Sequence, residues 1–320
     1  MNLEIIGAES LGVRSLCCFI ETGDRAILID PGVALGYLRN SLLPHPVQVA
    51  AVEVLRSRII DRWTRATDIV ISHFHGDHTP LPDANPFQLS VKSLVGLNDR
   101  ATLWTKGNGF LSPREKARAH AVSEILGKPM VRAEGLSDGP LTFSEPVRHG
   151  REGANAVTVM MTRVRGEITF VHGSDNQLMN GRAVEIMRGW APDVLFTDGP
   201  PLYLSGTTED DSALARKHAL SLSVPGRTLV VDHHLFRSRS GVCWFEELAA
   251  ESSGTVLSAA GYMGRPPLFL EADRELLYDL MPVPEGWHSD YAQGRVQTTP
   301  YAEQAIETYS EQAEWITRAD

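Results

Sequence analysis

The sequence predicts a layered α/β protein, and three observations support this fold class. Short, apolar and β-branched runs lie between glycine-containing turns, which is typical of buried strands. Longer stretches with apolar residues at three-to-four spacing are typical of helices, and the two kinds of segment alternate along the chain. Polar residues directly follow several of the strands. Alternating strands and helices pack as layers, and the loops that leave the carboxyl ends of strands carry the chemistry in such folds.

The first third of the chain is rich in predicted strands. They cover residues 3–6, 15–20, 26–29 and 67–72. The third strand ends at Asp30, and Pro31-Gly32 then predicts a sharp turn. Residues 47–65 predict a helix, because apolar side chains recur there at the spacing of one helix face.

The middle of the chain continues this alternation. Ser112 opens a capping box with proline at the first helical position, which predicts a helix that ends at Gly127. A β-hairpin is predicted next, with strands at residues 156–164 and 167–171. Two more buried strands and the helix between them are predicted at residues 194–197, 228–231 and 208–223.

The last forty residues or so differ in character from the rest of the chain. Residues 282–299 are irregular, and Thr299-Pro300 opens an acidic helix that extends to about residue 316. We therefore expect one domain over residues 1–281. Residues 282–320 are expected to form a C-terminal segment that packs on this domain or makes an oligomer contact.

The composition is that of an ordinary soluble globular protein, with 320 residues of which 42% are hydrophobic and 22% charged. The net charge of −10 argues against nucleic acid as the main partner and leaves a small molecule as the expected substrate. Neither a signal peptide nor a membrane span is predicted. Cys17, Cys18 and Cys243 form no spaced ligand or redox pair, which favours buried, reduced thiols and a cytoplasmic protein.

The strongest motif is His73-Phe74-His75-Gly76-Asp77-His78, which follows the predicted strand at residues 67–72. Side chains two apart in an extended segment point the same way, so His73 and His75 can bind one ion together. Gly76 allows a sharp turn that can bring Asp77 and His78 to a second ion close by. Imidazole and carboxylate ligands suit zinc, iron and manganese.

Two ions need more donors than this segment supplies, so other ligands must come from distant loops. His149 precedes the predicted hairpin, and Asp175 follows its second strand. His233 and His234 follow the strand at residues 228–231. Each of these residues alone could be a satisfied polar group, but their shared placement near strand ends favours a common site.

These residues resemble the pattern of a known family. The segment from His73 to His78 resembles the signature of the metallo-β-lactamase superfamily, and Asp30, His149, Asp175 and a late histidine match its other marks in order. The resemblance covers roughly residues 1–280. Three stretches further resemble an uncharacterised, mainly archaeal branch of predicted metal-dependent hydrolases, at residues 198–204, 232–235 and 258–260.

The resemblance implies an αββα sandwich, in which two facing mixed sheets are flanked by helices and two metal ions lie at one edge. One ion would be held by His73, His75 and His149, the other by Asp77, His78 and a late histidine, with Asp175 bridging them. The late ligand is His233 or His234, and we favour His233 because Arg237 follows it at a spacing similar to that in related phosphodiesterases. Adjacent strand residues face opposite ways, so only one of the two should reach the ions.

Four further residues are candidates for the surroundings of the ions. Asp30 is expected to orient a ligand rather than bind metal. Asp198 could line the pocket or cap a turn, and Asp232 could accept a hydrogen bond from a ligand imidazole. Arg237 could steady an anionic substrate group, with a surface salt bridge as the alternative.

The expected function is that of a dinuclear hydrolase acting on a small ester, lactone, amide or phosphodiester. Two divalent ions, zinc before iron or manganese, would lower the pKa of a shared water toward about 7, and Asp77 or Asp175 would handle the proton. Three alternatives stay open, namely a nuclease, an iron-containing redox enzyme on the same ligands, and a metal-stabilised binding module. A homo-oligomer is compatible with all of them.

Overall fold

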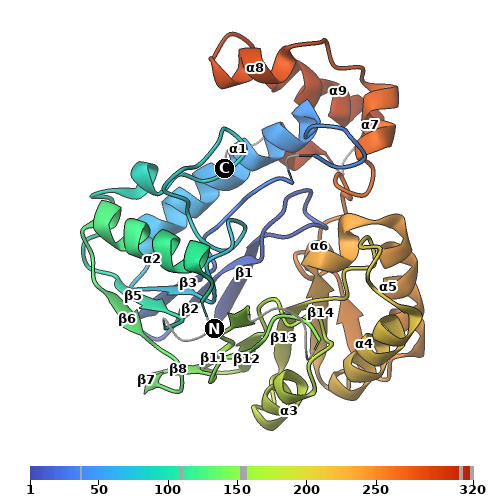
Figure 1. Ribbon diagram of the computed structural model, residues 1–320. Coiled ribbons are helices and arrows are strands. Elements are labelled where there is room, and N and C mark those ends of the chain that lie inside the picture. Colours follow the sequence, from blue (N-terminus) through green and yellow to red (C-terminus); the bar gives the residue numbers. More distant parts are fainter. Residues whose placement is uncertain (37, 108–110, 152–156, 310–312, 318–320) are drawn as a thin grey trace.

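Figure 1 shows the computed structural model of the protein, which describes residues 1–36, 38–107, 111–151, 157–309 and 313–317. Two mixed sheets lie face to face, with helices on the outer side of each (Figure 1). Apolar side chains from both sheets, among them Ile20, Val70, Phe170 and Val230, form one buried cluster between them. The predicted layered α/β class and the αββα arrangement are therefore confirmed.

The first sheet has the strand order β1-β2-β3-β4-β5-β6. Its strands are β1 (Asn2–Gly7), β2 (Cys17–Thr22), β3 (Arg25–Ile29), β4 (Asp68–Ile71), β5 (Thr102–Thr105) and β6 (Met130–Arg132). The first three pair antiparallel, whereas β3 to β6 pair parallel. The first four strands match those predicted to within a few residues. All four residues of β4 are buried, as its continuous apolar run requires in a parallel, covered sheet.

The second sheet has the order β15-β14-β13-β12-β11-β8-β7. Its strands are β7 (Ser137–Asp138), β8 (Leu141–Phe143), β11 (Thr162–Arg165), β12 (Thr169–His172), β13 (Val194–Asp198), β14 (Thr228–Asp232) and β15 (Thr255–Leu257). Strands β12 to β15 pair parallel, so the carboxyl ends of β12, β13 and β14 meet at one edge. The predicted strands at residues 194–197 and 228–231 are confirmed.

The predicted hairpin strand at residues 156–164 is wrong as one element, and residue 156 lies outside the described residues. Its first part forms β10 (Thr158–Val159), which pairs with β9 (Val147–Arg148) in a separate two-stranded sheet. The chain then leaves the strand path, because the Met160 amide donates to the carbonyl of Ser72 in the first sheet (N···O 3.0 Å). Only residues from 162 onward pair with β12.

Helices cover both outer faces of the sandwich. On the first sheet lie α1 (Pro46–Arg65) and α2 (Pro113–Leu126), and on the second lie α3 (Gly181–Gly189), α4 (Glu209–Leu222) and α5 (Arg239–Glu251) (Figure 1). The capping box of α2 is present, and Gly127 ends it with φ +62°, as predicted. The α1 and α4 helices also match their predicted spans.

The C-terminal segment packs on α1. After the short α6 (Ala259–Tyr262), the chain forms α7 (Arg274–Leu280), α8 (Trp287–Ala292), α9 (Thr299–Tyr309) and a 3-10 turn (Glu314–Thr317). Trp287, Ala302 and Ala305 join the same buried cluster as α1 residues. The predicted terminal helix is present as α9, but residues 314–317 form a 3-10 turn instead of continuing it. A domain boundary after residue 281 and an oligomer contact stay predictions. Nowhere in the described parts of the chain is a helix long and apolar enough to cross a membrane.

Candidate metal centre

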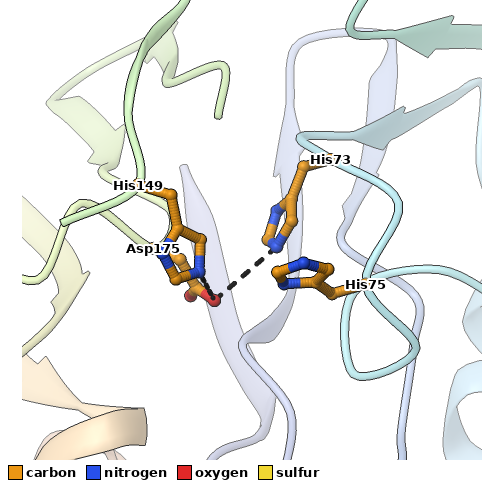
Figure 2. A group of neighbouring side chains, drawn as sticks. All are labelled: His73, His75, His149 and Asp175. Atoms are coloured by element: carbon orange, nitrogen blue, oxygen red, sulfur yellow. Dashed lines mark ion pairs between the residues drawn. The ribbon is translucent and has the colours of Figure 1, made fainter. Parts of the chain in front are cut away.

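The predicted ligands converge where the two sheets share an edge. The segment His73 to His78 leaves the end of β4 in the first sheet, whereas His149, Asp175 and His233 follow β9, β12 and β14. Figure 2 shows His73 and His75 on one side of the site and His149 and Asp175 on the other, with their polar atoms turned toward one another. Residues about 160 positions apart in the chain therefore meet because two sheets pack face to face.

The Asp175 carboxylate lies at the middle of this cluster. Its Oδ2 atom is 3.0 Å from Nε2 of His78, 3.4 Å from Nε2 of His149 and 3.6 Å from Nε2 of His73. Its Oδ1 atom is 3.6 Å from Nε2 of His233. Taken together, the two oxygens thus face imidazole nitrogens of residues that follow strands of both sheets.

Several of these atoms are buried and find no hydrogen-bond partner among the residues that the structure describes. They are Nε2 of His73, His78 and His149, and Oδ1 of Asp175. A buried polar atom without a partner is costly, so four of them turned into one space need a ligand. The donor set, imidazole nitrogens around a carboxylate, is the one that zinc and related ions bind. The residues therefore fit a metal site.

Three groups of side chains have ligand atoms within 4.8 Å of one another. They are His73, His75, His149 and Asp175; Asp77, His78 and His233; and Asp175, His233 and His234. The first two groups have the composition implied by the family resemblance, with Asp175 beside both. The structure brings these residues together, and their role as metal ligands stays a prediction.

Asp30 holds the first-sheet ligands in place. Its carboxylate accepts hydrogen bonds from the Ser72 amide (2.8 Å) and hydroxyl (2.7 Å), and Oδ2 is 2.8 Å from Nδ1 of His78. This contact fixes the His78 ring with Nε2 toward Asp175, as expected of a residue that orients a ligand. The turn after Asp30 approaches closely, since a Cβ on Gly32 would lie 2.3 Å from the Thr79 amide nitrogen.

Both late histidines have a ligand atom near Asp175, and which of the two would bind an ion stays a prediction. Strand β14 ends at Asp232, and His233 adopts φ +56° at the start of a 3-10 turn (His233–Arg237), so strand alternation no longer applies. The two rings lie 4.6 Å apart. His233 lies 3.4 Å from Asp77, whereas Nδ1 of His234 is 2.9 Å from Oδ2 of Asp198.

Two of the candidate acids have partners that the sequence did not reveal. Asp198 does more than cap a turn. One of its carboxylate oxygens accepts from the Gln177 amide (2.7 Å), and the other contacts Nδ1 of His234. Asp232 accepts from three backbone amides, those of Ser10, His233 and Ala259. The expectation that Asp232 accepts from a ligand imidazole is therefore corrected: it fastens the loop that carries His233.

Arg237 is buried rather than part of a surface salt bridge. Its guanidinium donates to Oε1 of Glu9 (2.5 Å), to Oδ2 of Asp77 (3.1 Å) and to Nε2 of His233 (2.9 Å). It also donates to the Tyr203 hydroxyl (3.1 Å). Sequence reasoning missed Glu9, although an acid placed directly after β1 follows the same strand-end pattern as the ligands.

The remaining histidines serve packing or the surface. Nε2 of His172 contacts the Leu16 carbonyl at 2.9 Å, and His45, His218 and His288 also contact backbone carbonyls. His120 is exposed and lies beside Glu124. Among the cysteines, Cys17 and Cys18 are buried as expected, but Cys243 is exposed.

Burial and neighbouring charges set the protonation of the cluster. Burial and the nearby His149 lower the pKa of His75 to about 4, and burial, with His78, lowers the pKa of His73 well below its ordinary value. Burial opposes charge on His78, yet Asp175 and Asp30 outweigh it and raise its pKa well above 6.5. His73 and His75 are thus neutral at pH 7, which is the form that binds metal, whereas the two acids favour the charged form of His78.

Comparison with known proteins places the chain in a family. It is 45% identical to a UPF0282 protein of Methanosarcina mazei over 302 residues, which is 94% of this chain and 99% of that protein. The chain belongs to the UPF0282 family. UPF0282 proteins of Pyrococcus furiosus and Methanopyrus kandleri are each 33% identical to it over 87% of this chain, and over 92% and 99% of their own lengths.

Other comparisons of this UPF0282 protein are weaker. No protein-family model matches the sequence. Among solved structures, an isothiocyanate hydrolase from Delia radicum gut bacteria is similar with a TM-score of 0.44 and 16% identity, covering 77% of this chain and 94% of that one.

Proposed function

We propose that this UPF0282 protein is a metal-dependent hydrolase of the metallo-β-lactamase superfamily that uses two divalent ions, zinc in the first place. Its substrate would be a small ester, lactone, amide or phosphodiester. The observation that carries the proposal is the set of buried, unpartnered Nε2 and Oδ1 atoms that two sheets turn toward one another. An ordinary polar cluster would pair these atoms among themselves.

The ligand sets follow from the three groups of side chains. His73, His75 and His149 would hold one ion, and Asp77, His78 and His233 the other, with Asp175 between them. His234 also has a ligand atom near those of Asp175 and His233, and its Nδ1 lies 2.9 Å from Asp198, so it is the alternative to His233. When bound, the ions supply Lewis acidity and make a water molecule acidic enough to attack at neutral pH.

The protein's own residues would orient the site and move the proton. Of the two carboxylates proposed to accept it, Asp77 is the accessible one, with 15% of its side chain exposed against 1% for Asp175. Arg237 fixes Oδ2 of Asp77 and Nε2 of His233 on one side of the site. Asp77 therefore fits the role of proton acceptor, and Asp175 fits that of a buried bridge.

The test begins with metal content. Protein purified without chelators should contain nearly two equivalents of divalent metal and hydrolyse at least one substrate of an ester, lactone and phosphodiester panel. His75→Ala should lose both metal and turnover, whereas His120→Ala, an exposed histidine away from the cluster, should lose neither. A wild-type protein free of metal would refute the proposal.

The same measurements separate the alternatives. Cleavage of RNA or DNA with strong salt dependence would favour the nuclease. A coloured, iron-loaded protein would favour the redox enzyme. Full metal content without turnover on the panel would favour a binding module.

A further inference from the structure

A second feature lies against the metal centre, namely a cavity of about 530 Å³ that opens beside it. His75 and Asp77, which belong to the two proposed ligand sets, form part of its wall. The start of α2 contributes Ser112, Arg114 and Arg118 to the lining, and Arg14 also belongs to it. A cavity of this volume fits a small molecule, and any ligand in it would lie next to the ions.

Three arginines contribute positive charge to the cavity, and the carboxylates of Asp83, Asp77 and Glu115 act on one of them, Arg118. Arg14 forms an ion pair with Glu271, with 3.0 Å between Nη2 and Oε1. Within the described residues, neither Arg114 nor Arg118 forms an ion pair. Arg118 donates a hydrogen bond to the carbonyl of Phe74, the residue between the two metal-binding histidines. That bond ties one guanidinium to the histidine segment itself.

The two acids that line the same cavity are only partly engaged, since Oε1 of Glu115 is buried without a hydrogen-bond partner among the described residues. Asp77 is paired with Arg237 at 3.1 Å. Glu115 is buried, and its Oε2 accepts from the Ser112 amide at 2.9 Å as part of the α2 capping box. The amino-terminal turn of α2 adds a partial positive charge on this side. An acidic protein of net charge −10 therefore holds a locally positive cavity next to its candidate metal centre.

We propose that this cavity binds the phosphate group of a small phosphate ester. Arg114 and Arg118 would contact the phosphate oxygens, and the phosphorus atom would lie toward His75 and Asp77. The inference rests on the proposed hydrolase and narrows its substrate class. Guanidinium groups match phosphate oxygens by paired hydrogen bonds. A phosphate presents oxygens in several directions, so it can contact arginines and the ion site at once, whereas a planar carboxylate has two oxygens only.

The experiment uses full-length, metal-loaded protein and two matched arginine variants. Arg114→Met removes an exposed cavity charge that forms no hydrogen bond or ion pair within the described residues, so the fold should survive. Arg100→Met removes an exposed charge outside the cavity and serves as the control. Since Arg118 also holds the Phe74 carbonyl, Arg118→Lys, which keeps the charge, accompanies Arg118→Met to separate charge from folding.

Two readouts are compared. The first is the ratio of kcat/KM for bis(p-nitrophenyl) phosphate to that for neutral p-nitrophenyl acetate, which should fall about tenfold in Arg114→Met and Arg118→Met but not in Arg100→Met. The second is the affinity for inorganic phosphate by calorimetry, with and without chelator. It should weaken in the same two variants, and part of it should persist after the metal is removed.

Each outcome decides between the two proposals. Turnover of esters with no arginine effect on either readout would overturn the cavity proposal and leave the hydrolase intact. If phosphate binding vanished with the metal and were equal in all variants, the anion would bind to the ions alone. That result would also overturn the cavity proposal. Arginine-dependent phosphate binding without any turnover would support the cavity and refute the hydrolase. Tighter, arginine-dependent binding of a short RNA than of phosphate esters would overturn the assignment to a small molecule.

Discussion

Replacing Asp30 by asparagine changes a single group in the wall of the metal centre and should weaken metal binding without removing a ligand. The Asp30 carboxylate is fully buried and lies 2.8 Å from Nδ1 of His78, so it favours a proton on that nitrogen and leaves Nε2, which is turned toward Asp175, as the atom that would bind an ion. An asparagine that still accepts from the Ser72 amide turns its NH₂ group toward His78. The ring then has to accept at Nδ1 and carry its proton on Nε2, which can no longer bind metal.

The size of the effect follows from the contact that is lost. A hydrogen bond to a charged group contributes about 1.5–3 kcal/mol, and residues that orient metal ligands commonly change metal affinity by roughly 10- to 100-fold. Competitive titration with a chromophoric chelator should therefore show one ion bound about 10- to 100-fold more weakly in Asp30→Asn. Asp61→Asn, the same change at an exposed acid, should bind both ions as the wild type does.

Unchanged affinity for both ions in Asp30→Asn, with the fold intact by circular dichroism, would refute this reasoning. It would mean that His78 is oriented by the metal or by Asp175 rather than by Asp30. Loss of both ions together would instead point to collapse of the Ser72 contacts, which the urea midpoint of the metal-free protein would reveal.

Three further changes test other parts of the structure. His45 is the buried cap of α1, and burial lowers its pKa to about 4. The neutral ring stabilises the fold fully above pH 6.5, and this contribution is lost as the pH falls toward 4. Between these limits the urea-derived free energy of unfolding should therefore fall by about 3 kcal/mol more in the wild type than in His45→Asn, which keeps a cap. Gly32→Ala places a Cβ 2.3 Å from the Thr79 amide nitrogen, and we expect a loss of about 1–3 kcal/mol together with lower metal content by elemental analysis. Thr208→Ala removes the α4 cap far from the ions, so a loss of about 1 kcal/mol with unchanged metal content is expected; altered metal content there would contradict the assignment of the site.

Local patterns were sufficient to predict most of the fold. Buried strands such as β4, β13 and β14 are continuous apolar runs, and the caps of α2 and α4 are local, so each is visible within a few residues. The hairpin strand failed because its path depends on a bond from Met160 to Ser72 in the other sheet. No local pattern records such a contact.

The candidate site likewise has parts that a local sequence pattern predicts and parts that it does not. The segment from His73 to His78 is a local motif, and the distant ligands were predicted from their placement near strand ends. The rest depended on backbone conformation or on burial. His233 leaves the strand with φ +56°, so the strand alternation used to choose one late histidine does not apply, and Arg237 is buried against Glu9. Neither the φ angle nor the burial of a charged side chain can be deduced from residue type alone.

The division of the candidate ligands between the two sheets has a consequence for folding. An ion shared by His73 of the first sheet and His149 of the second would join distant parts of the chain much as a covalent cross-link does, and would close a loop of some seventy residues. The folded fraction would then rise with the free concentration of metal by mass action. In a cell, the abundance of the folded chain would follow the local supply of that metal.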